Sequence, residues 1–161
     1  MPVRPRRRTQ AMPASAVETN AYAGIHRVAL TPQAVAGGKV ERQMLGRWPK
    51  PRAIKLWRAA KQLFVGEGLE TTLGAATREI YHGAPMRPAW AAGSSGSLAR
   101  LPLIDGVEEL VILVDHDPSG KETADACRRT WKAAGRKVTR LLPPPGKDFN
   151  DIVLEKLRGP P

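Results

Sequence analysis

The segment at residues 109–114 (ELVILV) limits most strongly how this chain can fold. It is a continuous run of mostly branched apolar residues, which is typical of a strand buried on both faces of a parallel sheet. The run leads directly into Asp115-His116-Asp117, and apolar residues then recur at helical spacing up to Gly135. This order of strand, acidic turn and helix predicts an α/β fold in which strands alternate with helices.

Three further short strands are predicted on either side of that segment. They cover residues 62–66 (QLFVG), 88–92 (PAWAA) and 137–142 (KVTRLL). A helix with apolar residues three and four apart follows the first strand from Leu69, and a short helix capped by the serines of 93–96 (GSSG) follows the second. The pattern predicts a roughly four-stranded, mostly parallel sheet flanked by helices, and right-handed crossovers would place the carboxyl ends of all four strands along one edge.

Charge divides the 161 residues into two parts. Residues 1–60 contain 12 Lys and Arg against 2 acidic residues, whereas residues 61–161 contain 14 against 13, so the net charge of +11 lies almost entirely in the first part. An excess confined in this way indicates a polyanionic partner such as nucleic acid. Residues 1–21 are rich in Pro and small side chains, so we expect a flexible basic arm. Residues 22–60 are expected to form a basic β-rich segment that turns at Gly37-Gly38, ahead of the α/β domain at 61–158.

Composition excludes several classes of protein. No apolar run approaches the length of a membrane span, and no signal sequence is present, so a cytoplasmic location is expected. The single cysteine, Cys127, excludes an internal disulfide and a zinc module built from this chain alone. Its place on the apolar face of the helix after residue 117 predicts a core position, and we expect His116 to be packed or solvated rather than a metal ligand.

Acidic residues follow the predicted strands where these end. They are Glu67 after the first strand, Asp115 and Asp117 after the third, and Asp148 and Asp151 after the fourth. Carboxylates gathered at one edge raise each other's pKa, and a hard divalent ion such as Mg²⁺ relieves that repulsion. The alternative, that each acid caps the helix after it, stays open for any single residue. It does not account for two aspartates bracketing one residue at the end of the most buried strand.

These residues resemble a known family. Glu67-Gly68, Asp115-x-Asp117-x-x-Gly120 and residues 146–151 (GKDFND) together resemble the Toprim domain, the catalytic fold shared by type IA and II topoisomerases, bacterial-type primases and some nucleases. The stretches GLETTLGA, WAAGSSGSLARLP and GKDFND are similar to the primase-like Toprim proteins of phages, plasmids and other mobile elements. The resemblance covers roughly residues 22–155 and implies the Toprim, Rossmann-like fold.

The resemblance also implies a role for each acid. Glu67 matches the family's metal-associated general acid/base, and Asp115 and Asp117 match the pair that coordinates Mg²⁺, with Mn²⁺ as an alternative ion. Asp148 and Asp151 occupy the place of acids that help hold a second ion in primases. Primases of the family often have an aspartate where this chain has Thr71; whether Glu70, one position earlier, replaces it stays open.

The implied activity is nucleotidyl transfer from nucleoside triphosphates, making primers on single-stranded DNA during replication of a mobile element. Four basic residues of the β-rich segment are expected to hold the template strand: Lys39, Arg42, Arg47 and Lys55. Two alternatives remain, a Toprim nuclease that uses the same acids with water as the nucleophile, and a non-catalytic nucleic-acid-binding fragment of a larger primase-helicase. The sequence contains neither a zinc module nor a helicase motor, so we expect a helicase or zinc-module partner or a longer parent protein.

Overall fold

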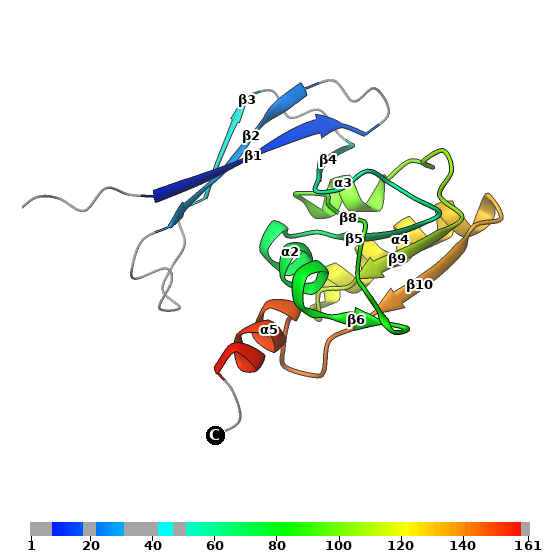
Figure 1. Ribbon diagram of the computed structural model, residues 1–161. Helices are drawn as coiled ribbons and strands as arrows, with labels where there is room; N and C mark the ends of the chain where they lie inside the picture. The colour runs from blue at the N-terminus through cyan, green and yellow to red at the C-terminus, as the bar shows by residue number, and fades with distance from the viewer. Residues whose placement is uncertain (1–7, 18–21, 31–41, 47–50, 159–161) are drawn as a thin grey trace, which may run out of the picture.

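The structure is a computed structural model that describes residues 8–17, 22–30, 42–46 and 51–158. Its centre is an eight-stranded sheet in the order β10-β9-β5-β8-β4-β1-β2-β3 (Figure 1). The strands are β1 (Arg8–Ala16), β2 (Tyr22–Leu30), β3 (Arg42–Gly46), β4 (Arg52–Lys55), β5 (Gln62–Gly66), β8 (Ala89–Ala91), β9 (Glu109–Leu113) and β10 (Lys137–Leu141). The helices are α2 (Leu69–Arg78), α3 (Ser95–Ala99), α4 (Pro118–Ala133) and α5 (Phe149–Arg158). A small hairpin pairs β6 (Ile80–Tyr81) with β7 (Ala84–Pro85).

The four strands predicted around the apolar segment form the parallel half of the sheet. β10 pairs with β9, β9 with β5 and β5 with β8, all in parallel. The prediction of four mostly parallel strands is therefore confirmed, and β5 has the expected bounds. Parallel pairing brings the carboxyl ends of these strands to one edge, where Glu67 follows β5 and Asp115 follows Val114 after β9.

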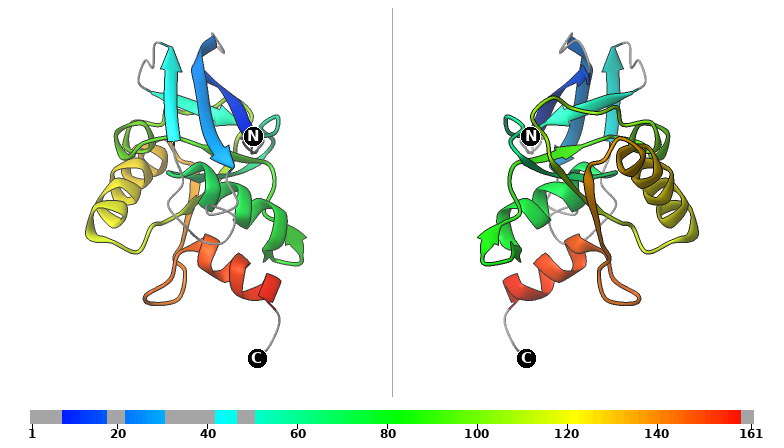
Figure 2. Two further views of the ribbon diagram at one scale, coloured as in Figure 1. Left: turned by 90° about the vertical axis from the view of Figure 1, so that its left-hand side faces the viewer. Right: turned by 90° about the vertical axis from the view of Figure 1, so that its right-hand side faces the viewer.

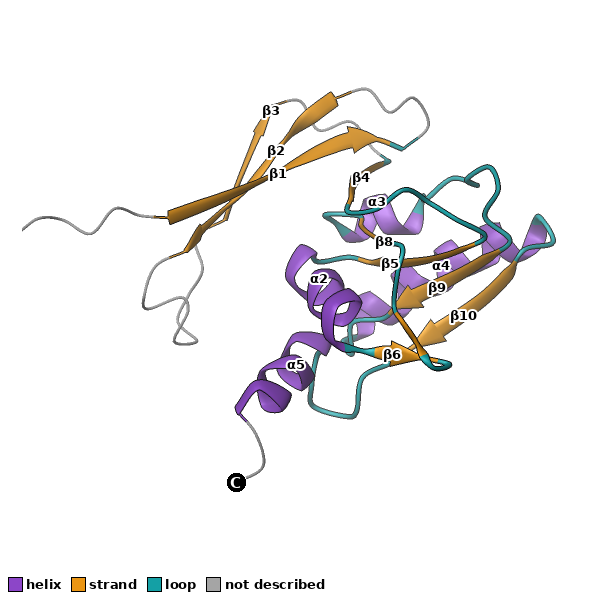
Figure 3. Cartoon of the chain, in the orientation of Figure 1, coloured by secondary structure: helices purple, strands orange, loops and turns teal. Residues whose placement is uncertain are grey.

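Helices cover both faces of this parallel half (Figure 3). Successive strand residues point to opposite faces. On β5, Leu63 and Val65 accordingly join a core with residues of α3 and α4, whereas Phe64 joins a second core with residues of α2 and α5. Trp131 of α4 lies in the first core with no exposed surface, and its indole N–H donates to the Leu101 carbonyl at 3.1 Å. Cys127 is also fully buried there, as predicted, and burial raises the pKa of its thiol to about 12.

The strands before residue 60 extend the same sheet, so it is larger than the four strands predicted. β4 pairs antiparallel with β8 and with β1, and β2 pairs antiparallel with both β1 and β3. Figure 2 shows β1, β2 and β3 at one end of the molecule and α5 at the other. The predicted turn at Gly37-Gly38 lies outside the described residues.

The expectation of a flexible arm over residues 1–21 is wrong for residues 8–16, which form β1 between β2 and β4. Composition suggested too little apolar surface for an ordered segment, but a strand between two neighbours satisfies its backbone hydrogen bonds through pairing. Small side chains also suffice for close packing: Ala14 has no exposed surface and packs with Ile54, Leu69 and Ala91.

Besides β1, the β6–β7 hairpin and α5 were not predicted. Helix α5 contains Asp151, begins directly after Asp148 and packs against α2, with Phe149 and Val153 both buried. Within the described residues, no helix is both long and apolar enough to cross a membrane.

Candidate active site at the carboxyl edge of the parallel strands

Glu67 is fixed at the end of β5 by both its backbone and its side chain. Its carbonyl accepts the Gly93 N–H at 2.8 Å, and its carboxylate accepts the backbone N–H of Ser95. Burial is the main cause that raises the pKa of Glu67. The nearby charges of Asp115 and Asp117 raise it further, and the hydrogen bond from Ser95 opposes them. The Glu67 carboxylate is therefore oriented, and it lies close enough to Asp115 and Asp117 for their charges to raise its pKa.

Asp115 lies beside the first turn of α4. A Cβ atom on Gly120 would lie 2.6 Å from the Asp115 carbonyl oxygen, so only glycine allows the turn to approach this closely. Burial raises the pKa of Asp115 first, followed by the charges of Asp117 and Asp148. The electrostatic effects therefore link four of the five predicted acids, Glu67, Asp115, Asp117 and Asp148, into one cluster.

Asp117 and Asp148 also cap helices, as the alternative interpretation anticipated. The Gly120 N–H donates to Asp117 Oδ1 at 2.6 Å, which makes Asp117 the N-cap of α4. The Asp151 N–H donates to Asp148 Oδ1 at 2.7 Å, and Asp151 Oδ2 accepts the Asp148 N–H at 2.9 Å. This reciprocal pair caps α5 and occupies one oxygen of each carboxylate.

A cavity of about 440 Å³ opens at this edge of the sheet. Its lining joins the two halves of the molecule, with residues of β2 and β3 facing the start of α2 and the loop before α5. The lining residues include His26, Met44, Glu67, Glu70, Thr71 and Asp148. The sequence left open whether Glu70 replaces the aspartate that primases often have at the position of Thr71. Both residues line this cavity. Asp151 is exposed and does not.

The donor set of the cluster suits a hard divalent ion, because every candidate ligand is a carboxylate oxygen. Burial first, and then the charges of neighbouring carboxylates, raise the pKa of Glu67 and Asp115, so negative charge on these two side chains is costly. Among the described residues, no three acidic, histidine or cysteine side chains are close enough to enclose an ion as they stand. Neighbouring carboxylates repel each other without a cation, so the residues present fit Mg²⁺ in chemistry and location.

Of the residues expected to hold DNA, Lys39 and Arg47 lie outside the described residues. Arg42 begins β3. Lys55 is half-buried on β4, where its ammonium donates to the Val17 carbonyl at 3.1 Å and lies 4.8 Å from the centre of the Trp90 ring.

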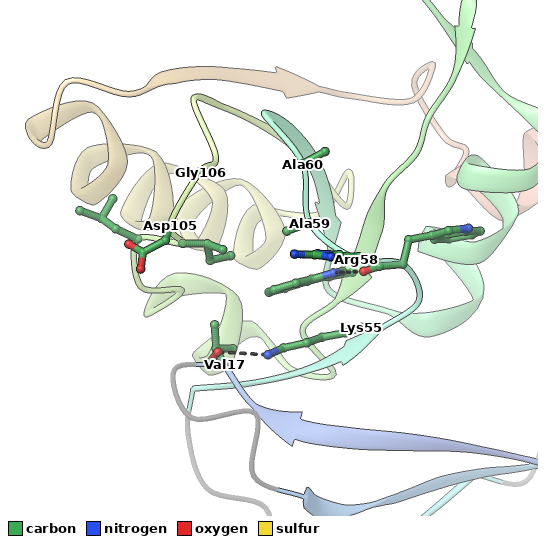
Figure 4. Close-up of a pocket in the computed structure, with 11 residues that line it drawn as sticks. Val17, Lys55, Arg58, Ala59, Ala60, Asp105 and Gly106 are labelled. Carbon is green, nitrogen blue, oxygen red and sulfur yellow. Dashed lines mark hydrogen bonds between the residues drawn. The ribbon is translucent and has the colours of Figure 1, made fainter.

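A larger cavity, of about 840 Å³, adjoins the loops that precede β5 and β9 (Figure 4). Lys55, Arg58 and Asp105 lie around it together with the indoles of Trp57 and Trp90. Loops that precede parallel strands lie at their amino ends, and this cavity contains none of the clustered acids. The two cavities are thus at opposite edges of the parallel strands.

Sequence reasoning missed the residues that hold the acids in place. The serines of residues 93–96 were predicted to cap a short helix, which the Ser94 cap of α3 confirms, but the contact of Ser95 with Glu67 had no local signal. His26 had none either, since it reaches the cavity only because β2 lies across the sheet. His116 is half-buried, and its Nδ1 atom has no hydrogen-bond partner among the described residues.

Comparison with known proteins supports this assignment. A family model described as the Toprim domain matches residues 62–159, more than half of the chain and all of the clustered acids. The chain belongs to the Toprim family. No curated protein matches it.

Two solved structures share the fold. The primase fragment of the bacteriophage T7 primase-helicase protein superimposes with a TM-score of 0.62 at 17% sequence identity, covering 91% of this chain and 58% of that one. A DNA primase domain from Pseudomonas aeruginosa superimposes with a TM-score of 0.52 at 16% identity, covering 91% of this chain and 54% of that one. The Toprim chain thus spans less than two thirds of either structure, and both matches extend beyond the Toprim domain into the β-rich half.

Proposed function

We propose that this Toprim protein is a Mg²⁺-dependent, primase-type nucleotidyltransferase that makes primers on single-stranded DNA in the replication of a mobile element. The observation that carries the proposal is the acid cluster of Glu67, Asp115, Asp117 and Asp148 at the carboxyl edge of the parallel strands, where burial and the neighbouring carboxylates raise the pKa of Glu67 and Asp115. The likeness in fold to two primase structures supports primer synthesis over other Toprim chemistries.

In the proposed reaction, the 3′-hydroxyl of the growing primer forms a bond to the α-phosphorus of a nucleoside triphosphate while the bond to pyrophosphate breaks. The hydroxyl proton must pass to a base. Glu67 is the candidate, because its carboxylate is oriented by Ser95 and its raised pKa brings it closer to neutral pH. Once protonated, Glu67 is also less repelled by Asp115, which favours acceptance of the proton.

The residues that would hold the ion are Asp115 and Asp117, with Glu67 beside them and Asp148 and Asp151 in place for a second one. Bound Mg²⁺ would stabilise the charge on the attacking and leaving oxygens. Asp117 and Asp148 are already held by backbone N–H groups, so each presents its second oxygen from a fixed position.

The basic β-rich segment would hold the template next to this cluster. β2 and β3 line the cavity that contains Glu67, so a strand bound along them would reach the acids. Lys39, Arg42, Arg47 and Lys55 remain the proposed contacts with its phosphates. We further propose that residues 61–158 act as the catalytic unit in the cytoplasm, together with a helicase or a zinc module that supplies template recognition.

The test is incubation of the protein with single-stranded DNA, labelled ribonucleoside and deoxyribonucleoside triphosphates, and Mg²⁺ or Mn²⁺. We expect labelled oligomers from the wild type and none from Asp115→Asn/Asp117→Asn. The matched control is Asp105→Asn, which removes an exposed carboxylate beside the larger cavity and should leave synthesis unchanged.

Other outcomes identify the two alternatives. Metal-dependent degradation of the template, lost in the double variant, would show a Toprim nuclease. Binding of DNA without either activity, with or without an added helicase, would show a non-catalytic fragment and refute the proposal.

A further inference from the structure

Arg52 is a buried cation that the proposed chemistry does not use. It lies on β4, opposite Ala16 of β1, and only 5% of its surface is exposed. Its Nη2 donates to Ser94 Oγ at 3.4 Å, and its Nε would lie 3.9 Å from a Cβ atom on Gly93. The guanidinium therefore packs against the turn formed by Gly93 and Ser94. Burial of such a group is costly, so an apolar side chain would fill the same space at less cost.

The turn above Arg52 is the one that holds Glu67. Ser94 Oγ, which receives the guanidinium, also accepts the Ser97 N–H at 3.3 Å and so caps α3. The next residue, Ser95, donates its backbone N–H to the Glu67 carboxylate, and Gly93 donates its own to the Glu67 carbonyl at 2.8 Å. A continuous set of contacts thus runs from the β-rich segment through the turn to the candidate base.

The hydrogen bond from Ser95 fixes one lone pair of the Glu67 carboxylate, and it thereby determines the directions in which the other lone pairs of that group point. Gly93 adopts a φ of +74°, a region that glycine enters and leaves at little steric cost, so the backbone of this residue alone does not hold the turn in place. If the turn moved, the Ser95 N–H would leave the Glu67 carboxylate, which could then rotate away from Asp115. Accurate placement of a catalytic carboxylate requires this kind of support from residues that do not react.

We propose that Arg52 is a positioning residue for Glu67: its guanidinium supports the turn at Gly93 and Ser94, through which the Ser95 N–H orients the Glu67 carboxylate. The inference deepens the proposed function and rests on it for the role of Glu67. Strand β4 would then have two roles: it joins the basic segment to the parallel sheet, and through Arg52 it orients Glu67.

The first test follows the Ser95 amide by ¹H–¹⁵N NMR. In the wild-type background, Glu67→Gln should shift the Ser95 resonance, because the charged acceptor is lost. In the Arg52→Met background the same change should have a much smaller effect, since the amide has already left the carboxylate. Arg58→Gln removes an exposed guanidinium just beyond β4 and should retain the full wild-type response.

The second test measures the affinity for Mn²⁺ alone, without DNA or nucleotides. Loss of one orienting hydrogen bond, worth about 1 kcal/mol, should weaken binding by about fivefold in Arg52→Met. Ser94→Ala should act through the same contacts, so the double variant should bind no more weakly than the weaker single variant. Arg58→Gln should bind as the wild type does.

A wild-type Ser95 response and Mn²⁺ affinity in Arg52→Met would overturn the inference, whatever the melting temperature of the variant, because Arg52 would then be structural only. If Arg52→Met does not fold, Arg52→Lys and Ser94→Ala carry the same two measurements. Absence of primer synthesis by the wild type would contradict the proposed function alone, since both measurements are made without substrates.

Discussion

Substitution of Gly120 by alanine tests the geometry on which the acid cluster depends. Gly120 lies in the first turn of α4, and its own N–H donates to Asp117 Oδ1. An added Cβ atom would lie 2.6 Å from the Asp115 carbonyl oxygen and 2.9 Å from the Asp115 Cβ, closer than real carbon contacts allow. Neither of these atoms belongs to the flexible end of a side chain, so the turn or the end of β9 must move.

The expected loss is the difference between two effects. Forcing extra volume into a packed site costs about 1–3 kcal/mol. Replacing a helical glycine by alanine gains at most about 1 kcal/mol, and less in a first turn. The net loss should be about 1–2 kcal/mol, which for a chain of this length lowers the melting temperature by about 2–4 °C per kcal/mol.

Urea unfolding and thermal melting, with Gly74→Ala as the matched control, measure this loss. Gly74 lies in the middle of α2, where an added Cβ would make an ordinary contact with Val153 Cγ2 at 3.4 Å. That variant should be unchanged or more stable by up to about 1 kcal/mol. Opposite signs for the same chemical change would support the geometry, whereas a Gly120→Ala protein as stable as wild type would refute the close approach of α4 to Asp115.

Three further predictions concern charged residues. Burial and neighbouring acids raise the pKa of Asp115 and Glu67, so above the usual carboxyl range the native state holds protons that the unfolded chain has released. The free energy of unfolding should therefore fall as pH rises through this range. Asp115→Asn should reduce this dependence on pH, measured by urea unfolding between about pH 4 and 7. Asp117→Asn keeps a capping oxygen and should retain stability, whereas Asp117→Ala should lose about 1 kcal/mol, and both should lose Mn²⁺ affinity in a direct titration. Changing Lys39 and Arg47 to Gln should weaken the salt dependence of binding to single-stranded DNA. The slope of the logarithm of the binding constant against the logarithm of the salt concentration should fall by about 0.7 for each lost phosphate contact. An unchanged slope would place the template elsewhere.

The parallel half of the sheet could be predicted because local pattern and tertiary position agree there. The run at 109–114 is apolar enough to require burial on both faces, and β9 is indeed fully buried from Leu110 to Leu113. Gly66, Gly93 and Gly135 mark the ends of elements, and the positions of four strands and three helices followed from local signals. The acids could be assigned to one edge because the order of parallel strands determines which ends meet.

The remaining parts depend on partners that are distant in sequence. β1 has few large side chains, and its place in the sheet comes from pairing with β2 and β4, which no local pattern reports. The cavity beside Glu67 is completed by His26 of β2 for the same reason. Arg52 reads locally as one more basic residue of the β-rich segment, and only the pairing of β4 with β1 and β8 buries it beneath the turn at Gly93.

Helix capping and metal binding, which the sequence presented as alternatives, are compatible at this site. Asp117 Oδ1 accepts the N–H of Gly120 and Asp148 Oδ1 accepts that of Asp151, so each cap uses one oxygen and leaves the other. Asp115 and Glu67 are more buried and have raised pKa values. The cluster therefore combines two acids whose positions are fixed by caps with two whose charge is costly without a cation, and a divalent ion bound among them would relieve that cost.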